Sequence, residues 1–185
     1  MIDDVMLSTE EKMEKALEAA KGELAAIRTG RANPSMFNPI LVDYYGAPTP
    51  LQQLAGITIP EARTVIVSPY DRSAMKAITT AIRESDLGVN PTDDGTIIRV
   101  TLPALTEERR RDYVKLARSR AEESRVQVRG IRGRSKKELE AIKRAGEAGE
   151  DDVKRAETEL DALTRRFVEA IDTALSAKES ELMEV

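Results

Sequence analysis

Hydrophobic residues recur at helical spacing near the start of the chain. Between residues 3 and 29 they are separated by seven, four, three, four and three positions: Met6, Met13, Leu17, Ala20, Leu24 and Ile27. This spacing places them in one narrow seam along a helix. We expect Asp3 to cap the start of this helix, and Gly30 and Pro34 to end it, because neither residue continues a helix comfortably.

Short β-rich runs replace this pattern between residues 36 and 102. Each is bounded by glycine or proline, as strands often are; the runs are Ile40–Tyr45, Ile57–Ile59, Thr64–Val67 and Thr96–Leu102. Between them, Asp71 can cap a short helix that covers the sheet with one apolar face. That face contains Ala74, Met75, Ile78, Ala81 and Ile82. Turns at Asn90-Pro91 and Asp94-Gly95 lead into the last strand.

Helical periodicity returns after residue 105. Thr106 is expected to cap a helix that runs to about Ala145, a length of roughly 60 Å at 1.5 Å per residue. Its seam contains Tyr113, Ala117, Ala121, Ser124, Val128, Ile131, Ser135, Leu139 and Ile142. Gly146 and Gly149 form a turn before a last helix over residues 150–182. Its seam alternates steps of three and four: Val153, Ala156, Leu160, Leu163, Phe167, Ala170 and Ala174.

Three helices with one apolar seam each can hide those seams only against each other. We therefore predict an α+β fold: a long three-helix bundle from residues 1–30 and 105–185, with residues 31–104 inserted as a small β/α/β sandwich-like domain. The chain would enter and leave this insert through two short linkers. Two such linkers together suggest a hinge, formed by Gly30, Ala32, Asn33, Pro34, Pro103, Ala104 and Leu105.

Composition narrows the possible functions. The chain has no cysteine and no histidine, which removes disulfides, thiolate chemistry, the commonest general base and the commonest neutral metal ligand. We expect no enzyme and no cofactor. Only 3% of residues are aromatic, so any nucleic-acid contact would use charge and shape rather than base stacking. The N-terminus resembles no secretory signal and no apolar run reaches membrane-spanning length, so we expect an intracellular, cytoplasmic protein.

A stripe of basic residues is the sharpest functional feature. Each of its members follows a seam residue of the second long helix: Arg118, Arg125, Arg129, Arg132, Lys136 and Lys143. Residues 109–144 hold fourteen Lys or Arg and five Asp or Glu, an excess of nine, although the net charge of the chain is -4. Such a surface is typical of proteins that bind a phosphate backbone.

The alternative interpretation is a solvated face whose cations pair with acids of the neighbouring helices. It accounts less well for Arg129 and Arg132, which adjoin Gly130 and Gly133. Two glycines inside a helix cost about 1 kcal/mol each relative to alanine. They would either let another backbone approach or merely loosen the helix.

Arg28 and Arg31 form a second basic group at the end of the first helix. They would either contact phosphate or favour the helix C-terminus electrostatically. Elsewhere, the pairs Asp93-Asp94 and Asp151-Asp152 could be imagined as ligands for a hard cation, although their places in a turn and in a first helical turn favour a structural role. Two alternative functions remain. One is a metal-assisted hydrolase that uses Asp93 and Asp94, and the other is a helical scaffold or chaperone-like module that binds protein partners through its long helices.

Five segments together resemble bacterial ribosome recycling factors across essentially the whole chain: Ile27–Ala32, Val42–Leu51, Ser85–Pro91, Leu102–Arg110 and Lys178–Leu182. The resemblance implies an L-shaped monomer that binds the large ribosomal subunit after termination and, with elongation factor G and GTP, splits the ribosome. It also implies that arginines of the helical domain contact ribosomal RNA and that the small domain swings about the linkers.

The family's RNA-contacting positions are matched by Arg28, Arg31, Arg129 and Arg132, and we add Arg125 and Lys136 from the basic stripe. One segment departs from the family, which usually has Arg-Asn-Ile/Val-Arg-Arg where this chain has Arg129-Gly130-Ile131-Arg132-Gly133. Arg134 follows directly and could replace the lost charge from a different angle.

Overall fold

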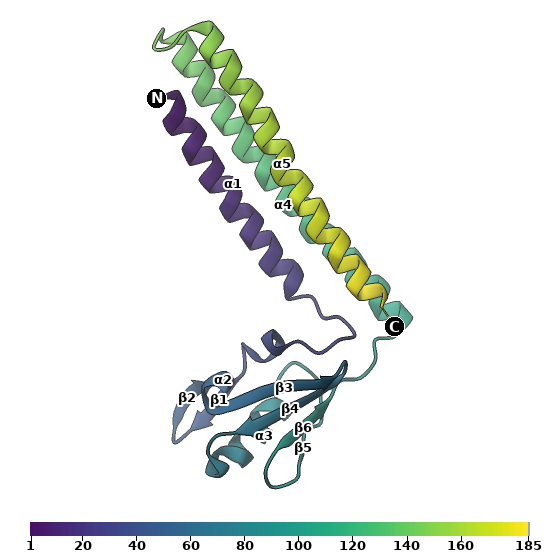
Figure 1. Cartoon of the computed structure of the whole chain (residues 1–185). Coiled ribbons are helices and arrows are strands. Elements are labelled where there is room, and N and C mark those ends of the chain that lie inside the picture. The colour runs from purple at the N-terminus through teal and green to yellow at the C-terminus, as the bar shows by residue number, and fades with distance from the viewer. Residues whose placement is uncertain (185) are drawn as a thin grey trace. The chain divides into compact units, whose positions relative to one another are not determined.

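The computed structural model describes residues 1–184, and in it the chain divides into two compact units. The first contains Met1–Ile27 and Arg111–Met183, and the second contains Arg28–Arg110. The first is built from long helices and the second from small antiparallel sheets with short helices (Figure 1). The fold class is therefore α+β, as predicted. Within residues 1–184 no helix has both the length and the apolar character needed to cross a membrane.

Three helices run side by side in the first unit (Figure 1): α1 (Ile2–Ala25), α4 (Glu107–Arg144) and α5 (Glu150–Met183). Across α1 and α4, the Thr9 and Ser135 hydroxyls lie 2.6 Å apart in a buried hydrogen bond. Across α1 and α5, Arg166 donates to Glu10 over 2.8 Å. Each helix thus contacts the others through polar groups as well as through its apolar seam.

The start and end of α1 differ from the prediction. Met1 occupies the N-cap position and no side chain caps the helix, so the predicted cap by Asp3 is wrong. Asp3 lies inside the first turn, where its negative charge interacts favourably with the positive end of the helix dipole. The helix ends at Ala25 because the backbone N–H groups of Ala26 and Ile27 close its last turn, onto Gly22 and Leu24.

The predicted seam holds in α4 and shifts in α5. All its members in α4 are buried except Tyr113, which is half-buried. In α5, the predicted members Leu163, Ala170 and Ala174 are half-buried, and Thr164, Ile171 and Lys178 are buried in their place. The α-helix has 3.6 residues per turn, so a strict alternation of three and four drifts around its surface. The buried row of α5 follows the true period.

Two antiparallel sheets form the second unit. One is the hairpin of β1 (Leu41–Tyr44) and β2 (Ala47–Pro50). The other has the strand order β3-β4-β6-β5 and comprises β3 (Ala55–Glu61), β4 (Thr64–Pro69), β5 (Thr92–Asp93) and β6 (Ile98–Thr101). The four predicted runs overlap β1, β3, β4 and β6, with bounds that differ by a few residues. Both β2 and β5 were missed, since neither has an alternating apolar pattern.

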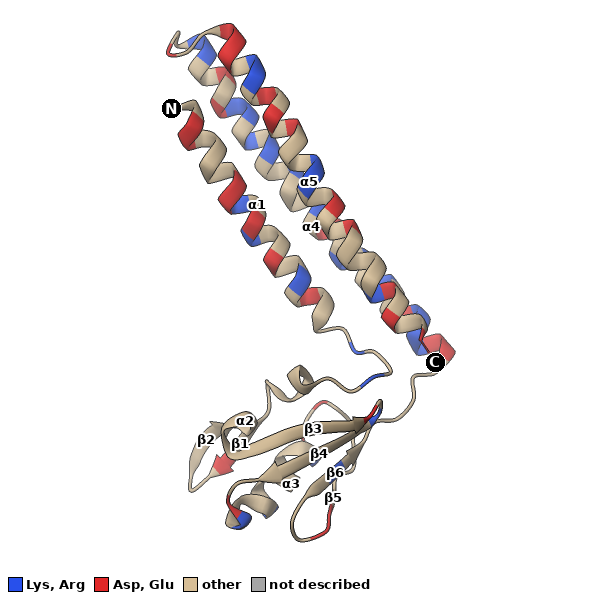
Figure 2. Cartoon of the chain, viewed as in Figure 1, with Lys and Arg blue, Asp and Glu red and all other residues tan. Residues whose placement is uncertain are grey.

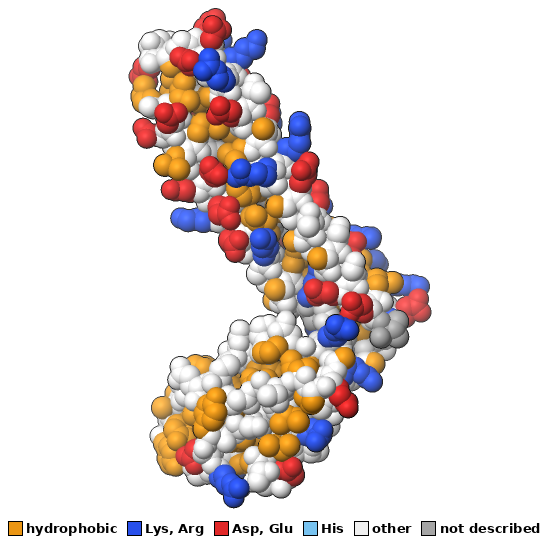
Figure 3. Space-filling model, viewed as in Figure 1, with side chains coloured by type: hydrophobic (Ala, Val, Ile, Leu, Met, Phe, Trp, Pro, Cys, Tyr) orange, Lys and Arg blue, Asp and Glu red, His pale blue; other side chains and the backbone are white. Residues whose placement is uncertain are grey.

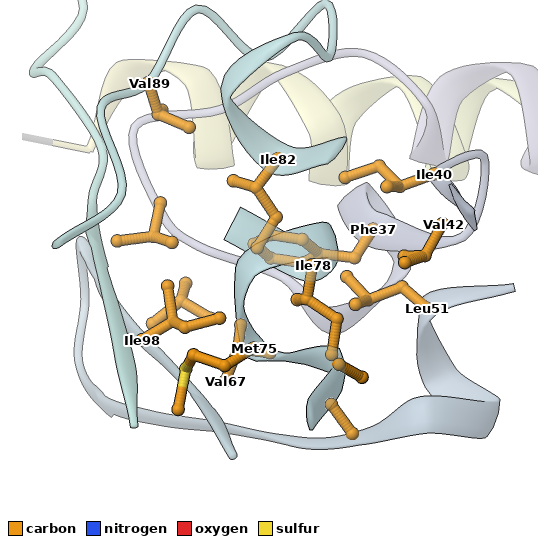
Figure 4. Packing of buried hydrophobic residues seen from close by; sticks show 14 of the residues in the cluster. Phe37, Ile40, Val42, Leu51, Val67, Met75, Ile78, Ile82, Val89 and Ile98 are labelled. Carbon is orange, nitrogen blue, oxygen red and sulfur yellow. The ribbon is translucent and has the colours of Figure 1, made fainter. Parts of the chain in front are cut away.

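Short helices complete the second unit: η1 (Pro34–Phe37), α2 (Leu51–Leu54), η2 (Arg72–Ala74) and α3 (Met75–Arg83). Asp71 accepts a hydrogen bond from the Ser73 N–H over 2.9 Å, which confirms the predicted cap. The Phe37 ring lies among aliphatic side chains of α2 and α3, with Leu51 and Ile78 close to it (Figure 4). This cluster is separate from those of the helical unit.

Candidate nucleic-acid interface

The basic stripe comprises Arg118, Arg125, Arg129, Arg132, Lys136 and Lys143 and lies along the flank of α4 that faces α5. Basic residues recur along the length of α4 (Figure 2). The Thr106 hydroxyl accepts a hydrogen bond from the Arg109 N–H over 3.1 Å and so caps the helix, as predicted. The helix then continues through Gly130 and Gly133 without a break. The stripe is thus held on one continuous element.

Acidic residues of α5 pair with four members of the stripe. We call these acids the acidic row: Glu150, Asp161, Asp172 and Glu179. The distances are 2.7 Å for Arg118–Glu179, 3.4 Å for Arg125–Asp172, 2.8 Å for Arg132–Asp161 and 3.8 Å for Lys143–Glu150. The residue numbers of the paired side chains rise along α4 as they fall along α5, because the two helices are antiparallel.

The alternative interpretation of the stripe is therefore right about pairing with α5. Sequence reasoning did not single out the acidic row, although its spacings of eleven, eleven and seven lie close to whole turns of a helix. Pairing does not remove the stripe from contact with a partner. Arg132 keeps 39% of its side chain exposed and Asp161 keeps 55%, and exposed pairs contribute only about 0–1 kcal/mol. A phosphate group can compete for such an arginine.

The members of the stripe differ in how far their side chains are exposed. Arg125 is the most enclosed, with 17% of its side chain exposed, and its Nη1 is buried without a hydrogen-bond partner among the described residues. Arg129 is exposed and lies 3.4 Å from Glu122 of its own helix. Lys136 is exposed, and within residues 1–184 no acid lies in ion-pair range of it. Arg118 is exposed as well, and Lys136 is the one member of the stripe that forms no ion pair within residues 1–184.

The two glycines of α4 face open space. A Cβ atom at Gly133 would meet nothing within 4 Å, and one at Gly130 would meet only Nη1 of Arg134, at 3.6 Å. Neither glycine is therefore required by a neighbouring helix of this chain. Arg134 follows Arg132 by two positions, about 200° around the helix, so it presents its charge on another face.

Arg28 and Arg31 lie beyond the end of α1, in the second unit, whereas the stripe belongs to the first. Because α1 ends at Ala25, neither arginine lies in its last turn. Nη2 of Arg28 donates to the carbonyl of Pro103 over 3.4 Å, and its Nε is buried without a partner among the described residues. Nε of Arg31 lies 3.1 Å from the Glu184 carboxylate.

Several predicted hinge residues are fixed within the second unit. The Ala32 N–H donates to the Ala62 carbonyl over 2.6 Å. The Asn33 side chain caps η1, and Pro34 begins that helix. Leu105 is buried. Gly30 and Ala104 lie outside helices and strands, as does Pro103.

The acidic pairs serve local structure. Asp94 accepts hydrogen bonds from the backbone N–H groups of Ile97 and Thr96, and these hold the pKa of its carboxyl below the ordinary value. Asp93 accepts one from Gly95 in the same turn. Asp151 and Asp152 lie in the first turn of α5. In the part of the chain that the structure describes, no three acidic side chains are grouped so as to hold a metal ion.

Comparison with known proteins gives a consistent result. Residues 20–183 match the family described as ribosome recycling factor. The ribosome-recycling factors of Beutenbergia cavernae and Kineococcus radiotolerans are 63% and 62% identical to this chain, and each match covers the whole of both chains.

Two solved structures extend the likeness to three dimensions. A solution structure of the ribosome recycling factor is 41% identical, with a TM-score of 0.80 over 100% of this chain and 98% of the other. The second is of the T. thermophilus factor, described together with E. coli elongation factor G bound to the E. coli post-termination complex. It is also 41% identical, with a TM-score of 0.68 over the whole of both chains. By sequence over its full length and by fold, the chain belongs to the ribosome recycling factor family.

Proposed function

We propose that this chain is a translation factor that binds the large ribosomal subunit after termination. With elongation factor G and GTP, it then dissociates the post-termination ribosome. Family membership supports the proposal, as does the T. thermophilus relative placed with elongation factor G on a post-termination complex. The observation that carries it in this chain is the basic stripe of α4, in a protein of net charge -4. We expect it to act in the cytoplasm, as a monomer.

Ribosomal RNA would be contacted by six side chains: Arg28, Arg31, Arg125, Arg129, Arg132 and Lys136. Five are arginines, whose planar forks match the oxygens of a phosphate better than a lysine ammonium does. The exposed members, Arg31, Arg129 and Lys136, would meet phosphate directly. Arg132 would do so with the part of its guanidinium that Asp161 leaves free.

The chain would supply binding and geometry rather than catalysis. It has no histidine and no cysteine, and its acidic pairs serve local turns. The free energy of GTP hydrolysis would come from elongation factor G. Gly30, Pro103 and Ala104 would form the hinge about which the small domain swings.

A subunit-splitting assay tests the proposal. Post-termination ribosomes are mixed with elongation factor G and GTP, and the separation of subunits is followed with and without the chain. We expect splitting with the wild type and a loss of about tenfold or more with Arg132→Ala, since charge-assisted hydrogen bonds are the strong ones.

Arg165→Ala is the matched control, because Arg165 is an exposed arginine of the same unit that lies outside the stripe. It removes the same charge and should split ribosomes as the wild type does. Absence of splitting by the wild type would reject the proposed function. Equal activity of the two variants would reject the stripe as its interface.

A further inference from the structure

The acidic row contacts the arginines of the stripe in one repeated way. In each of its three cross-helix pairs with arginine, the atom of the guanidinium nearest the carboxylate is Nε. For Arg132, Nε donates to Oδ1 of Asp161 over 2.8 Å. For Arg118, Nε donates to Oε1 of Glu179 over 2.7 Å. A contact at Nε occupies the inner edge of the guanidinium and leaves its two terminal amino groups unused.

These terminal amino groups stay available in the exposed pairs. Within residues 1–184, neither Nη of Arg132 has a hydrogen bond or an ion pair with another side chain, and the same holds for Arg118. Two parallel N–H groups at the end of a fixed fork match two oxygens of one phosphate. The carboxylate thus takes the side of the guanidinium that a phosphate does not need.

We infer that Asp161 is a positioning residue for RNA binding: it holds Arg132 by Nε and so presents the terminal amino groups of that arginine to a phosphate. This inference rests on the proposed function. An unrestrained arginine loses rotamer freedom when it binds, whereas one already held in place loses less. Part of that entropy is lost when the protein folds, before the RNA arrives.

The opposite effect of the carboxylate is electrostatic. Asp161 also repels a phosphate that approaches Arg132, so its removal could strengthen binding. Both groups are partly exposed, with 39% of the arginine and 55% of the aspartate side chain accessible, so solvent weakens this repulsion. The orienting hydrogen bond is local and depends little on solvent screening. We therefore expect positioning to outweigh repulsion.

Three variants separate the two effects. Asp161→Ala removes both the charge and the acceptor. Asp161→Asn removes the charge and keeps an oxygen that can accept from Nε. Glu159→Ala removes the same charge from an exposed site of α5 where, among the described residues, no ion pair is formed. The readout is the dissociation constant for isolated large ribosomal subunits at fixed salt, with circular dichroism as the check on folding.

Positioning predicts that Asp161→Ala binds about fivefold more weakly, the scale of one immobilised side chain. Asp161→Asn should stay within about twofold of the wild type, and Glu159→Ala should bind equally well or slightly more tightly. If Asp161→Ala behaves as Glu159→Ala does, the carboxylate is a bystander or a competitor and the inference is overturned.

A double-mutant cycle shows whether Asp161 acts through Arg132. Asp161→Ala should have no further effect once Arg132→Ala is present, whereas equal effects in both backgrounds would overturn the inference. The cycle also separates this inference from the proposed function. If Arg132→Ala weakens binding and Asp161→Ala does not, only the positioning role fails. If Arg132→Ala leaves binding unchanged, the proposed interface fails and the positioning role fails with it.

Discussion

Gly133 lies in the interior of α4, where a Cβ atom would meet nothing within 4 Å. We predict that Gly133→Ala raises the free energy of unfolding by about 1 kcal/mol, because glycine is the costlier residue inside a helix. Urea denaturation measures this change. Gly146→Ala is the control: Gly146 has a φ of 68°, which strains any side chain, so this variant should be destabilised. A less stable Gly133→Ala would show that the space is filled in solution.

Asp71 makes the stability of the second unit depend on pH. Hydrogen bonds from the Ser73 hydroxyl and N–H, and then from Tyr44, lower the pKa of this carboxyl below its ordinary value of 3.8. A lowered folded-state pKa means that the stabilisation is complete above pH 3.8 and is lost as pH falls through the folded-state pKa. We therefore predict that Asp71→Ala is clearly less stable than the wild type at pH 7.

This difference should shrink when unfolding is measured at successively lower pH below 3.8, as the pH falls towards the lowered folded-state pKa of the carboxyl. A difference that stays constant over this range would mean that the charge on Asp71 contributes nothing. Ser35→Ala, which removes a hydroxyl that donates to the Asn33 amide, is the control and should show no such pH dependence.

Single residues could be predicted from the sequence where one local rule decides. Asp71 and Thr106 precede helical runs, and both cap them as expected. Asp3 could not be placed in the same way, because the hydrophobic pattern does not show whether a helix begins at residue 2 or 4. The acidic partners of the stripe could not be predicted either, because they depend on the register between α4 and α5.

At the scale of elements, the buried row of α5 is the main correction. Ile171 is fully buried, whereas Leu163, which the alternating pattern placed in the seam, is half-buried. We predict that Ile171→Ala lowers the free energy of unfolding by about 2–5 kcal/mol and that Leu163→Ala costs clearly less. Urea denaturation of both variants measures the difference. Equal costs would favour the original seam.

The same row contains a residue that no hydrophobic pattern would include. The Lys178 side chain is only 8% exposed, and its nearest acid is Glu181 at 3.6 Å. Burial lowers its pKa, and Glu181 partly offsets this effect. The apolar stem of the lysine fills space between the helices, as long charged side chains can. Sequence periodicity therefore indicates which face of α5 is buried but not every member of it.

The hydrophobic pattern predicts only some of the strands. Those with apolar alternation, such as β6, were predicted. The missed strand β2 reads Ala-Pro-Thr-Pro and pairs with β1 because a two-residue turn at Tyr45-Gly46 brings them together. Its position is set by the hairpin rather than by its own residues.

For the molecule as a whole, charge decides how binding responds to salt. The basic stripe should release condensed counterions from RNA, so the logarithm of affinity should fall linearly with the logarithm of salt concentration. We predict that Arg132→Ala reduces this slope by about one unit, whereas Arg165→Ala leaves it unchanged. Titrations of large ribosomal subunits at four or more salt concentrations measure the slope. The same slope in both variants would contradict a phosphate contact by Arg132.

The distribution of charge over the surface explains why the net charge of the chain does not predict the basic stripe. Basic and acidic side chains alternate over the face of the helical unit shown in Figure 3, and this face carries no broad patch of one sign. The sum over the chain is -4, although residues 109–144 carry an excess of nine positive charges. Local counting along one helix predicted the stripe, and the total would have hidden it.

The first unit combines α1 with α4 and α5, which follow the second unit in the chain. This arrangement sets the order in which its segments are synthesised. Residues Arg28–Arg110 are continuous, so all the strands of the second unit are present before most of α4 has been synthesised. In contrast, α1 emerges first and waits on the order of ten seconds, at about 5–20 residues per second, until α5 is complete. The strands of the second unit can therefore pair before α5 is made, whereas the three-helix bundle cannot form until α5 has been synthesised.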